Sequence, residues 1–67
     1  MRDPERIKPF LEEVGNIWRK YCSDWRFGQF LNNALYEMIS KHGDMFFWEE
    51  DKFLEYLKEY FENSEKA

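Results

Sequence analysis

Apolar residues recur every three or four positions in three separate stretches of this chain. Such spacing places side chains on one face of an α-helix, so it predicts amphipathic helices. The three stripes are Ile7, Phe10, Leu11, Val14, Ile17, Trp18 and Tyr21; Phe27, Phe30, Leu31, Ala34, Leu35, Met38 and Ile39; and Phe53, Leu54, Leu57, Tyr60 and Phe61. The pattern predicts an all-α fold, a compact three-helix bundle with helices over about 4–21, 25–41 and 49–62.

Residues with known capping preferences mark the ends of these stretches. Asp3 is a candidate N-cap, and Pro4 suits the first helical position because the N–H it lacks would be unpaired there. Ser23 or Asp24 is placed to cap the second helix. Gly43 suits a helix end because it tolerates a left-handed backbone.

Four further features add detail to this outline. The aromatic connection 44–48 is expected to fold over the end of the core, since apolar side chains favour burial. Residues 63–67 are expected to form a frayed polar tail. Glycine is unfavourable inside a helix, so Gly15 predicts a close contact with another helix, and Gly28 one with another helix or with a ligand or partner.

At 67 residues the chain is expected to be one domain, 1–67, with one core. It has a single cysteine, Cys22, so an intramolecular disulfide is excluded. Stability must then come from dense packing, self-association or both. Eight apolar residues of the stripes are the predicted core: Phe10, Trp18, Phe27, Phe30, Leu31, Phe53, Leu57 and Phe61.

Charge restricts the classes of partner. The net charge is −4, and residues 44–67 alone carry three basic and eight acidic residues. Nucleic-acid binding depends on neutralising phosphates, so this acidic third makes nucleic acid an unfavourable partner. No apolar run approaches the length of a membrane span, and the N-terminal residues lack the apolar segment of a signal peptide. We therefore expect a cytoplasmic protein with no membrane partner.

No pattern of residues points to catalysis, a metal or a cofactor. Cys22 and His42 form an incomplete nucleophile–base pair, because such catalysis also needs an orienting group and an oxyanion hole. The acidic residues near the start of the third helix fit its dipole better than a cation site. These residues are Asp44, Glu49, Glu50 and Asp51.

The turn into the second helix carries the polar residues that are hardest to assign to structure. Arg26, Gln29 and Asn33 share one helix face, and arginine suits carboxylate or phosphate. The candidate partner-binding residues are Asp24, Trp25, Arg26, Gln29, Asn32 and Asn33. In the structural alternative, Asp24 caps the helix and Arg26 pairs with Glu49 or Glu50.

Fourteen aromatic residues exceed what three short helices are expected to enclose. The residues off the stripes or at their margins are Trp25, Tyr36, Trp48 and Tyr56. Aromatic residues are enriched in protein interfaces, so this surplus predicts a protein partner or a homodimer.

Several motifs together resemble a group of small uncharacterised bacterial and phage-associated helical proteins. The motifs are Arg2-Asp3-Pro4-Glu5-Arg6-Ile7, Trp18, the turn Asp24-Trp25-Arg26-Phe27-Gly28-Gln29, and the aromatic-then-acidic segment 46–51. Relatives often have proline before the central aspartate, where this chain has Ser23. The resemblance implies no activity, because the group has no assigned function.

The leading hypothesis is a small non-enzymatic interaction module, such as an adaptor, inhibitor or regulator. The alternative is a helix-turn-helix-like DNA-binding regulator that reads bases through Arg26, Gln29, Asn32 and Asn33. The connection before the third helix is too long for the tight turn of that motif, and the third helix is acidic. These features favour the interaction module.

Overall fold

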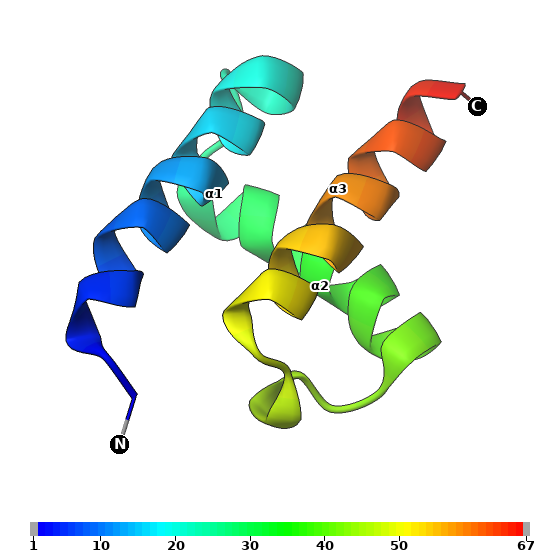
Figure 1. The fold of residues 1–67 in the computed structure, drawn as a ribbon. Helices are drawn as coiled ribbons and strands as arrows, with labels where there is room; N and C mark the ends of the chain where they lie inside the picture. Colours follow the sequence, from blue (N-terminus) through cyan, green and yellow to red (C-terminus); the bar gives the residue numbers. More distant parts are fainter. Residues whose placement is uncertain (1, 67) are drawn as a thin grey trace.

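The computed structural model describes residues 2–66, with side chains as far as Asn63. Among these residues it contains three α-helices, two 3-10 turns and no strand (Figure 1). The elements in chain order are η1 Pro4–Arg6, α1 Ile7–Cys22, α2 Phe27–His42, η2 Met45–Phe47 and α3 Glu50–Lys66. The predicted all-α, three-helix fold is confirmed.

The helix α3 is the common partner of the other two. It packs against both α1 and α2. Figure 1 shows α1 and α2 diverging from the turn that joins them, while α3 runs in the same direction as α1. As a result, the beginning of α1 and the end of α2 stand apart at one end of the molecule.

The chain enters α1 as its capping residues predict. The Asp3 side chain accepts a hydrogen bond from the backbone N–H of Glu5 at 3.0 Å, and Pro4 opens the first turn. Pro9 is accommodated in the first turn of α1, where its missing N–H leaves no broken hydrogen bond. The predicted start of the helical segment at residue 4 is confirmed, although its first turn is a 3-10 turn.

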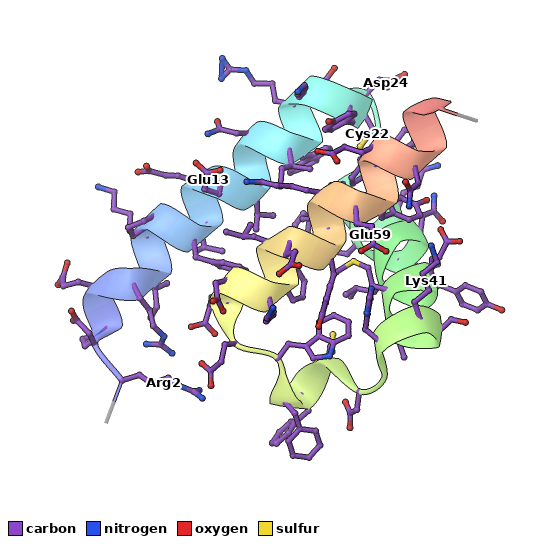
Figure 2. The ribbon with its side chains drawn as sticks, turned by 45° about the vertical axis from the view of Figure 1, so that its right-hand side comes forward. Arg2, Glu13, Cys22, Asp24, Lys41 and Glu59 are labelled. Carbon is purple, nitrogen blue, oxygen red and sulfur yellow. The ribbon has the colours of Figure 1, made fainter. Side chains whose placement is uncertain are left out.

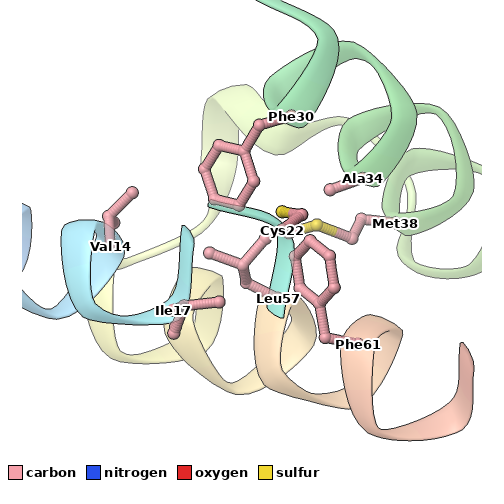
Figure 3. Packing of buried hydrophobic residues seen from close by; sticks show 8 residues of the cluster. All are labelled: Val14, Ile17, Cys22, Phe30, Ala34, Met38, Leu57 and Phe61. Carbon is pink, nitrogen blue, oxygen red and sulfur yellow. The ribbon is translucent and has the colours of Figure 1, made fainter. Parts of the chain in front are cut away.

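Aromatic rings from all three helices fill the centre of the core. Phe30 is fully buried and stacks between Trp18 and Phe61, with ring centroids 5.6 Å away on each side. The ring of Tyr21 stacks on the other side of Phe61 at 5.2 Å. Figure 3 shows the buried cluster around this stack, which comprises Val14, Ile17, Cys22, Phe30, Ala34, Met38, Leu57 and Phe61.

Most of the predicted core residues are in the core. Phe30, Leu57 and Phe61 are buried. Four more are half-buried against the cluster: Phe10, Trp18, Leu31 and Phe53. The prediction is wrong for Phe27, which is 51% exposed. It is the first residue of α2, and its ring lies tilted against the rings of Trp18 and Phe30, with centroids 5.4 and 6.4 Å away.

The second helix begins later than predicted and has a different cap. Arg26 has an extended backbone, with φ −70° and ψ 153°, and α2 starts at the next residue. No side chain caps α2, so the predicted capping by Ser23 or Asp24 is wrong. At the other end, Gly43 has φ +88° and its N–H donates to the carbonyl of Ile39 at 2.9 Å. The predicted glycine terminus is confirmed.

Two other details of the helices differ from the sequence-based expectation. The tail predicted over 63–67 is helical to Lys66, and Ala67 lies outside the described residues. A methyl group added to Gly15 or Gly28 would meet no atom within 4 Å. The close contacts with another helix predicted from these two glycines are therefore wrong, and both positions face open space; a ligand or partner at Gly28 stays a prediction.

Candidate functional site

The connection between α2 and α3 holds the most exposed apolar side chains. The Asp44 carboxylate accepts a hydrogen bond from the N–H of Phe46 at 2.9 Å, which fixes the turn η2. Phe46 and Phe47 are 82% and 76% exposed. Their rings meet edge to face with centroids 5.1 Å apart. For these two residues, the prediction that the connection folds over the core is wrong.

Trp48 does fold over the core as predicted. Its half-buried ring packs edge to face on Tyr56 at 5.0 Å and on Phe53 at 5.9 Å. The difference from its neighbours has a geometric cause. The chain is extended at Trp48, with φ −80° and ψ 132°, after the compact 3-10 turn, so successive side chains point in different directions.

Further exposed apolar residues lie in three elements: Ile7 and Leu11 in the first turns of α1, Ile39 near the end of α2, and Met45 in η2. Ile7 and Leu11 are 48% and 58% exposed, and Ile39 and Met45 are 40% and 42% exposed. Salt bridges from Arg2 and Arg6 hold the start of α1 beside the start of α3. We call the exposed side chains of η2 the apolar end; it comprises Met45, Phe46 and Phe47.

Paired charges border the apolar end. Arg2 contacts Glu49 at 2.6 Å, and Arg6 contacts Glu50 at 2.7 Å. The guanidinium of Arg6 also donates to the carbonyl of Asp3 at 3.0 Å. Since these acids are the neighbours of the aromatic pair in sequence, the charges beside Phe47 are neutralised within the chain.

The Arg26 segment keeps only part of its predicted binding surface. Arg26, Gln29 and Asn32 are exposed. Among the described residues Arg26 has no ion pair, because Glu49 and Glu50 pair with Arg2 and Arg6 instead. The structural alternative for Arg26 is therefore wrong, and its guanidinium is accessible.

Two residues of the predicted set, Asp24 and Trp25, have other surroundings. Trp25 is half-buried against the core, 6.4 Å from Phe61 between ring centroids. Its carbonyl accepts a hydrogen bond from Nε1 of Trp18 at 3.0 Å. Asp24 is exposed beside the end of α1, near Cys22 in Figure 2. Trp25 thus belongs to the structural core, and Asp24 remains a surface residue.

An open groove of about 360 Å³ is lined by residues of α2 and by one residue of α3. Both Asn32 and Asn33 line it, and of the two Asn33 is half-buried and Asn32 exposed. The other lining residues are Tyr36, Glu37, Ser40 and Tyr60. The groove is shallow and has hydrogen-bonding walls, which suit a polar contact but offer no enclosed site.

The residues Cys22 and His42 do not meet. Cys22 ends α1 beside the turn, whereas His42 ends α2 about 22 Å further along that helix, at a rise of about 1.5 Å per residue. Burial raises the pKa of the Cys22 thiol, and the carboxylate of Asp24 raises it further. A buried thiol of raised pKa is a poor nucleophile.

The acidic residues around the start of α3 form hydrogen bonds and salt bridges with other residues of this chain. Asp44 caps η2, and Glu49 and Glu50 are in salt bridges. The carboxylate of Asp51 accepts from the N–H of Lys52 at 2.8 Å. Within the part of the chain that the structure describes, no three His, Cys, Asp or Glu side chains gather as metal ligands would.

The aromatic surplus exists, but at different residues from those predicted. Trp25, Trp48 and Tyr56 are half-buried against the core, and of the predicted set only Tyr36 is largely exposed, at 81%. The exposed phenylalanines at 46 and 47 were missed. Four consecutive apolar residues in a short turn, Met45 to Trp48, cannot all point inward, and this was the available signal.

The comparisons with known proteins add no relative. No protein-family model, no curated protein and no solved structure matches this chain. The resemblance drawn from the sequence motifs therefore stays a hypothesis. Among the described residues, no helix combines the length and the apolar character that crossing a bilayer requires.

Proposed function

We propose that this chain is a small, non-enzymatic, cytoplasmic protein-interaction module. The observation that carries the proposal is the exposed pair Phe46–Phe47, fixed on a capped turn beside the exposed side chain of Met45. Phenylalanine favours burial, and exposed apolar clusters on small proteins mark interaction sites.

Interface chemistry supports this assignment. Protein interfaces have an apolar, aromatic centre and a polar rim. The apolar end has this composition, with phenylalanine rings at its most exposed point and salt bridges from Arg2 and Arg6 at its border. Those salt bridges close within the chain, so a partner would meet paired charges at Glu49 and Glu50 and, among the described residues, a carboxylate without an ion pair at Asp44.

Exposed polar residues at the start of α2 and just before it offer a second contact. Arg26, Gln29 and Asn32 suit an acidic or hydrogen-bonding partner. The DNA-binding alternative relies on the same residues. The surrounding charge argues against it, since α2 carries only Lys41 and His42 as further cationic groups and α3 is acidic.

The test is partner capture with the immobilised chain from a bacterial lysate, followed by mass spectrometry and rebinding of the purified candidate. The variant F46S/F47S should lose the captured protein. The matched control is Tyr36→Ser, which removes an equally exposed aromatic ring outside the apolar end. A protein that both variants retain, or a nucleic acid in the eluate that Arg26→Ala loses, would contradict the proposal.

A further inference from the structure

We infer that an open groove beside Trp18 binds an acidic segment of another protein. The groove has a volume of about 270 Å³ and is lined by Gly15, Trp18, Arg19 and Ser23; we call it the Trp18 groove. These residues belong to the second half of α1 and its C-cap, where the chain turns into α2 (Figure 1). The apolar end lies on a different element, so the inference does not depend on it.

The absence of a side chain at Gly15 opens the groove. Trp18 and Arg19 follow Gly15 by three and four positions, so the three residues share one face of α1. Gly15 is exposed, and a methyl group added to it would meet no atom within 4 Å. The backbone of α1 is therefore accessible at this position, where a segment of another protein can lie close to it.

Two aromatic rings give the groove an apolar wall. The half-buried ring of Trp18 lines it, and the ring of Phe27, which is 51% exposed, lies 5.4 Å from the Trp18 ring between centroids. The Nε1 atom of Trp18 donates to the carbonyl of Trp25 at 3.0 Å, which holds the indole in place. Because this N–H is already bonded, the accessible part of the ring offers contact to an apolar side chain.

The charge of the groove favours an acidic partner. Arg19 is the charged residue among those that line it, and it has no ion pair within the described residues. The exposed Arg26 directly follows the Trp25 carbonyl that accepts from Trp18, so its backbone lies beside the same indole. A guanidinium presents a planar fork of donors that matches a carboxylate. The acidic residue of this turn, Asp24, is not among the residues that line the groove.

Two other open grooves on the molecule have a different charge. The groove beside Asn33 is lined by Glu37. A groove between α1 and α3 is lined by Glu13 and Glu62 together with two lysines. Acidic side chains in these walls repel a carboxylate, whereas the Trp18 groove presents a cation and no carboxylate.

The same observations favour protein over nucleic acid. Nucleic-acid binding depends on the neutralisation of many phosphates, and the chain carries a net charge of −4. One arginine in the wall and one beside it match a short acidic segment with an apolar residue. The carboxylates of that segment pair with the arginines, and its apolar side chain packs on Trp18.

Two synthetic peptides that differ only in charge test the inference. The acidic probe is Glu-Glu-Leu-Phe-Glu-Glu and its neutral counterpart is Gln-Gln-Leu-Phe-Gln-Gln. Two-dimensional NMR spectra of the isotope-labelled chain follow the indole N–H of Trp18 and the backbone N–H groups of Gly15 and Arg19. The acidic peptide should shift these signals at millimolar concentration, and the neutral peptide should not.

Matched variants separate the groove from general attraction between charges. Arg19→Gln removes the cation, and Gly15→Leu fills the groove with a residue that favours a helix; each should raise the dissociation constant at least ~10-fold. The control is Lys8→Gln, which removes an exposed cation of α1 that also has no ion pair among the described residues. It should change the constant less than about 2-fold, because exposed charges are screened by salt.

Four outcomes would overturn the inference. These are no shift of the Trp18 indole with the acidic peptide, equal shifts with both peptides, equal weakening in Arg19→Gln and Lys8→Gln, and unchanged binding in Gly15→Leu. A single-stranded oligonucleotide that shifts the Trp18 signal at lower concentration than the peptide would assign the groove to nucleic acid instead. F46S/F47S should bind the acidic peptide as wild type does, so failure at the groove and failure at the apolar end are distinguishable.

Discussion

The imidazole of His42 lies flat on the ring of Tyr56, with centroids 3.7 Å apart and 6° between the planes. The Nε2 atom is buried and has no hydrogen-bond partner, although Oε1 of Glu59 lies 3.5 Å away. The Nζ atom of Lys41 lies 4.0 Å from the same carboxylate oxygen. Figure 2 labels Lys41 on α2 and Glu59 on α3. This contact joins the last turn of α2 to the middle of α3.

The geometry predicts different effects for two substitutions of His42. His42→Phe should keep the stacked contact and remove the unpaired nitrogen, so the free energy of unfolding should stay within about 1 kcal/mol of wild type or rise. His42→Ala should lower it by about 1–2 kcal/mol through loss of the aromatic contacts. Urea unfolding at neutral pH measures both. Equal losses in the two variants would show that the nitrogen, and not the stack, stabilises the contact.

The two arginines Arg6 and Arg26 should differ in their contribution to stability. Arg6→Ala should lower the free energy of unfolding by about 0.5–1 kcal/mol, because the half-exposed salt bridge with Glu50 is lost. Arg26→Ala should change it by less than about 0.5 kcal/mol, since no partner is removed. Thermal unfolding monitored by circular dichroism compares the two. A large loss in Arg26→Ala would assign this arginine to structure and remove it from the candidate surface.

Two glycines should respond oppositely to alanine. Gly15 lies in the interior of α1 with open space around it, so Gly15→Ala should raise the free energy of unfolding by about 0.5–1 kcal/mol. Gly43 has φ +88°, so Gly43→Ala should lower it by about 1–3 kcal/mol. Denaturant titration of both variants tests the pair. A destabilised Gly15→Ala would indicate a contact at that face of α1.

Because of Cys22, the free energy of unfolding should fall as the pH rises through the alkaline range. Burial raises the pKa of its thiol in the folded chain. The thiol of the unfolded chain has a pKa of about 8.5, so the stabilisation that the Cys22 thiol contributes to the folded chain is fully present below that pH. As the pH rises further, the unfolded state releases its proton first, and the free energy of unfolding falls through the folded pKa.

The matched control for this effect is Cys22→Ala, in which the lysine and tyrosine titrations remain. The difference between wild type and Cys22→Ala should fall as the pH rises from about 8 to 10. Urea unfolding at a series of pH values measures the difference, and the rate of reaction with a thiol reagent gives an independent reading. A constant difference across this range would contradict a raised thiol pKa.

Helical periodicity was enough to predict the fold because each stripe contains several apolar positions, and one misplaced residue does not change the period. Individual burial was harder to predict. Ile7 and Leu11 are on the α1 stripe but exposed, since their burial depends on how far α2 lies from that end of α1. Spacing along one helix contains no information on the angle between two helices.

The candidate surface was predictable only in part for a related reason. The sequence pattern indicated surplus aromatic residues, but their assignment depended on the path of a short turn. The hydrogen bond from Phe46 to Asp44 and the extended backbone at Trp48 determine which rings point outward. Likewise, the partner of Glu50 is Arg6 and not Arg26, because α1 begins beside α3.

The cap of Asp44 has a kinetic consequence. Gly43 ends α2, and Asp44 then fixes the turn that holds Phe46 and Phe47, so the backbone below the two rings is already ordered in the free chain. Binding of a pre-organised surface loses less conformational entropy than binding of a loop that must fold. Complexes formed through this turn should therefore associate without a slow conformational step, and differences in their affinity should appear mainly in the dissociation rate.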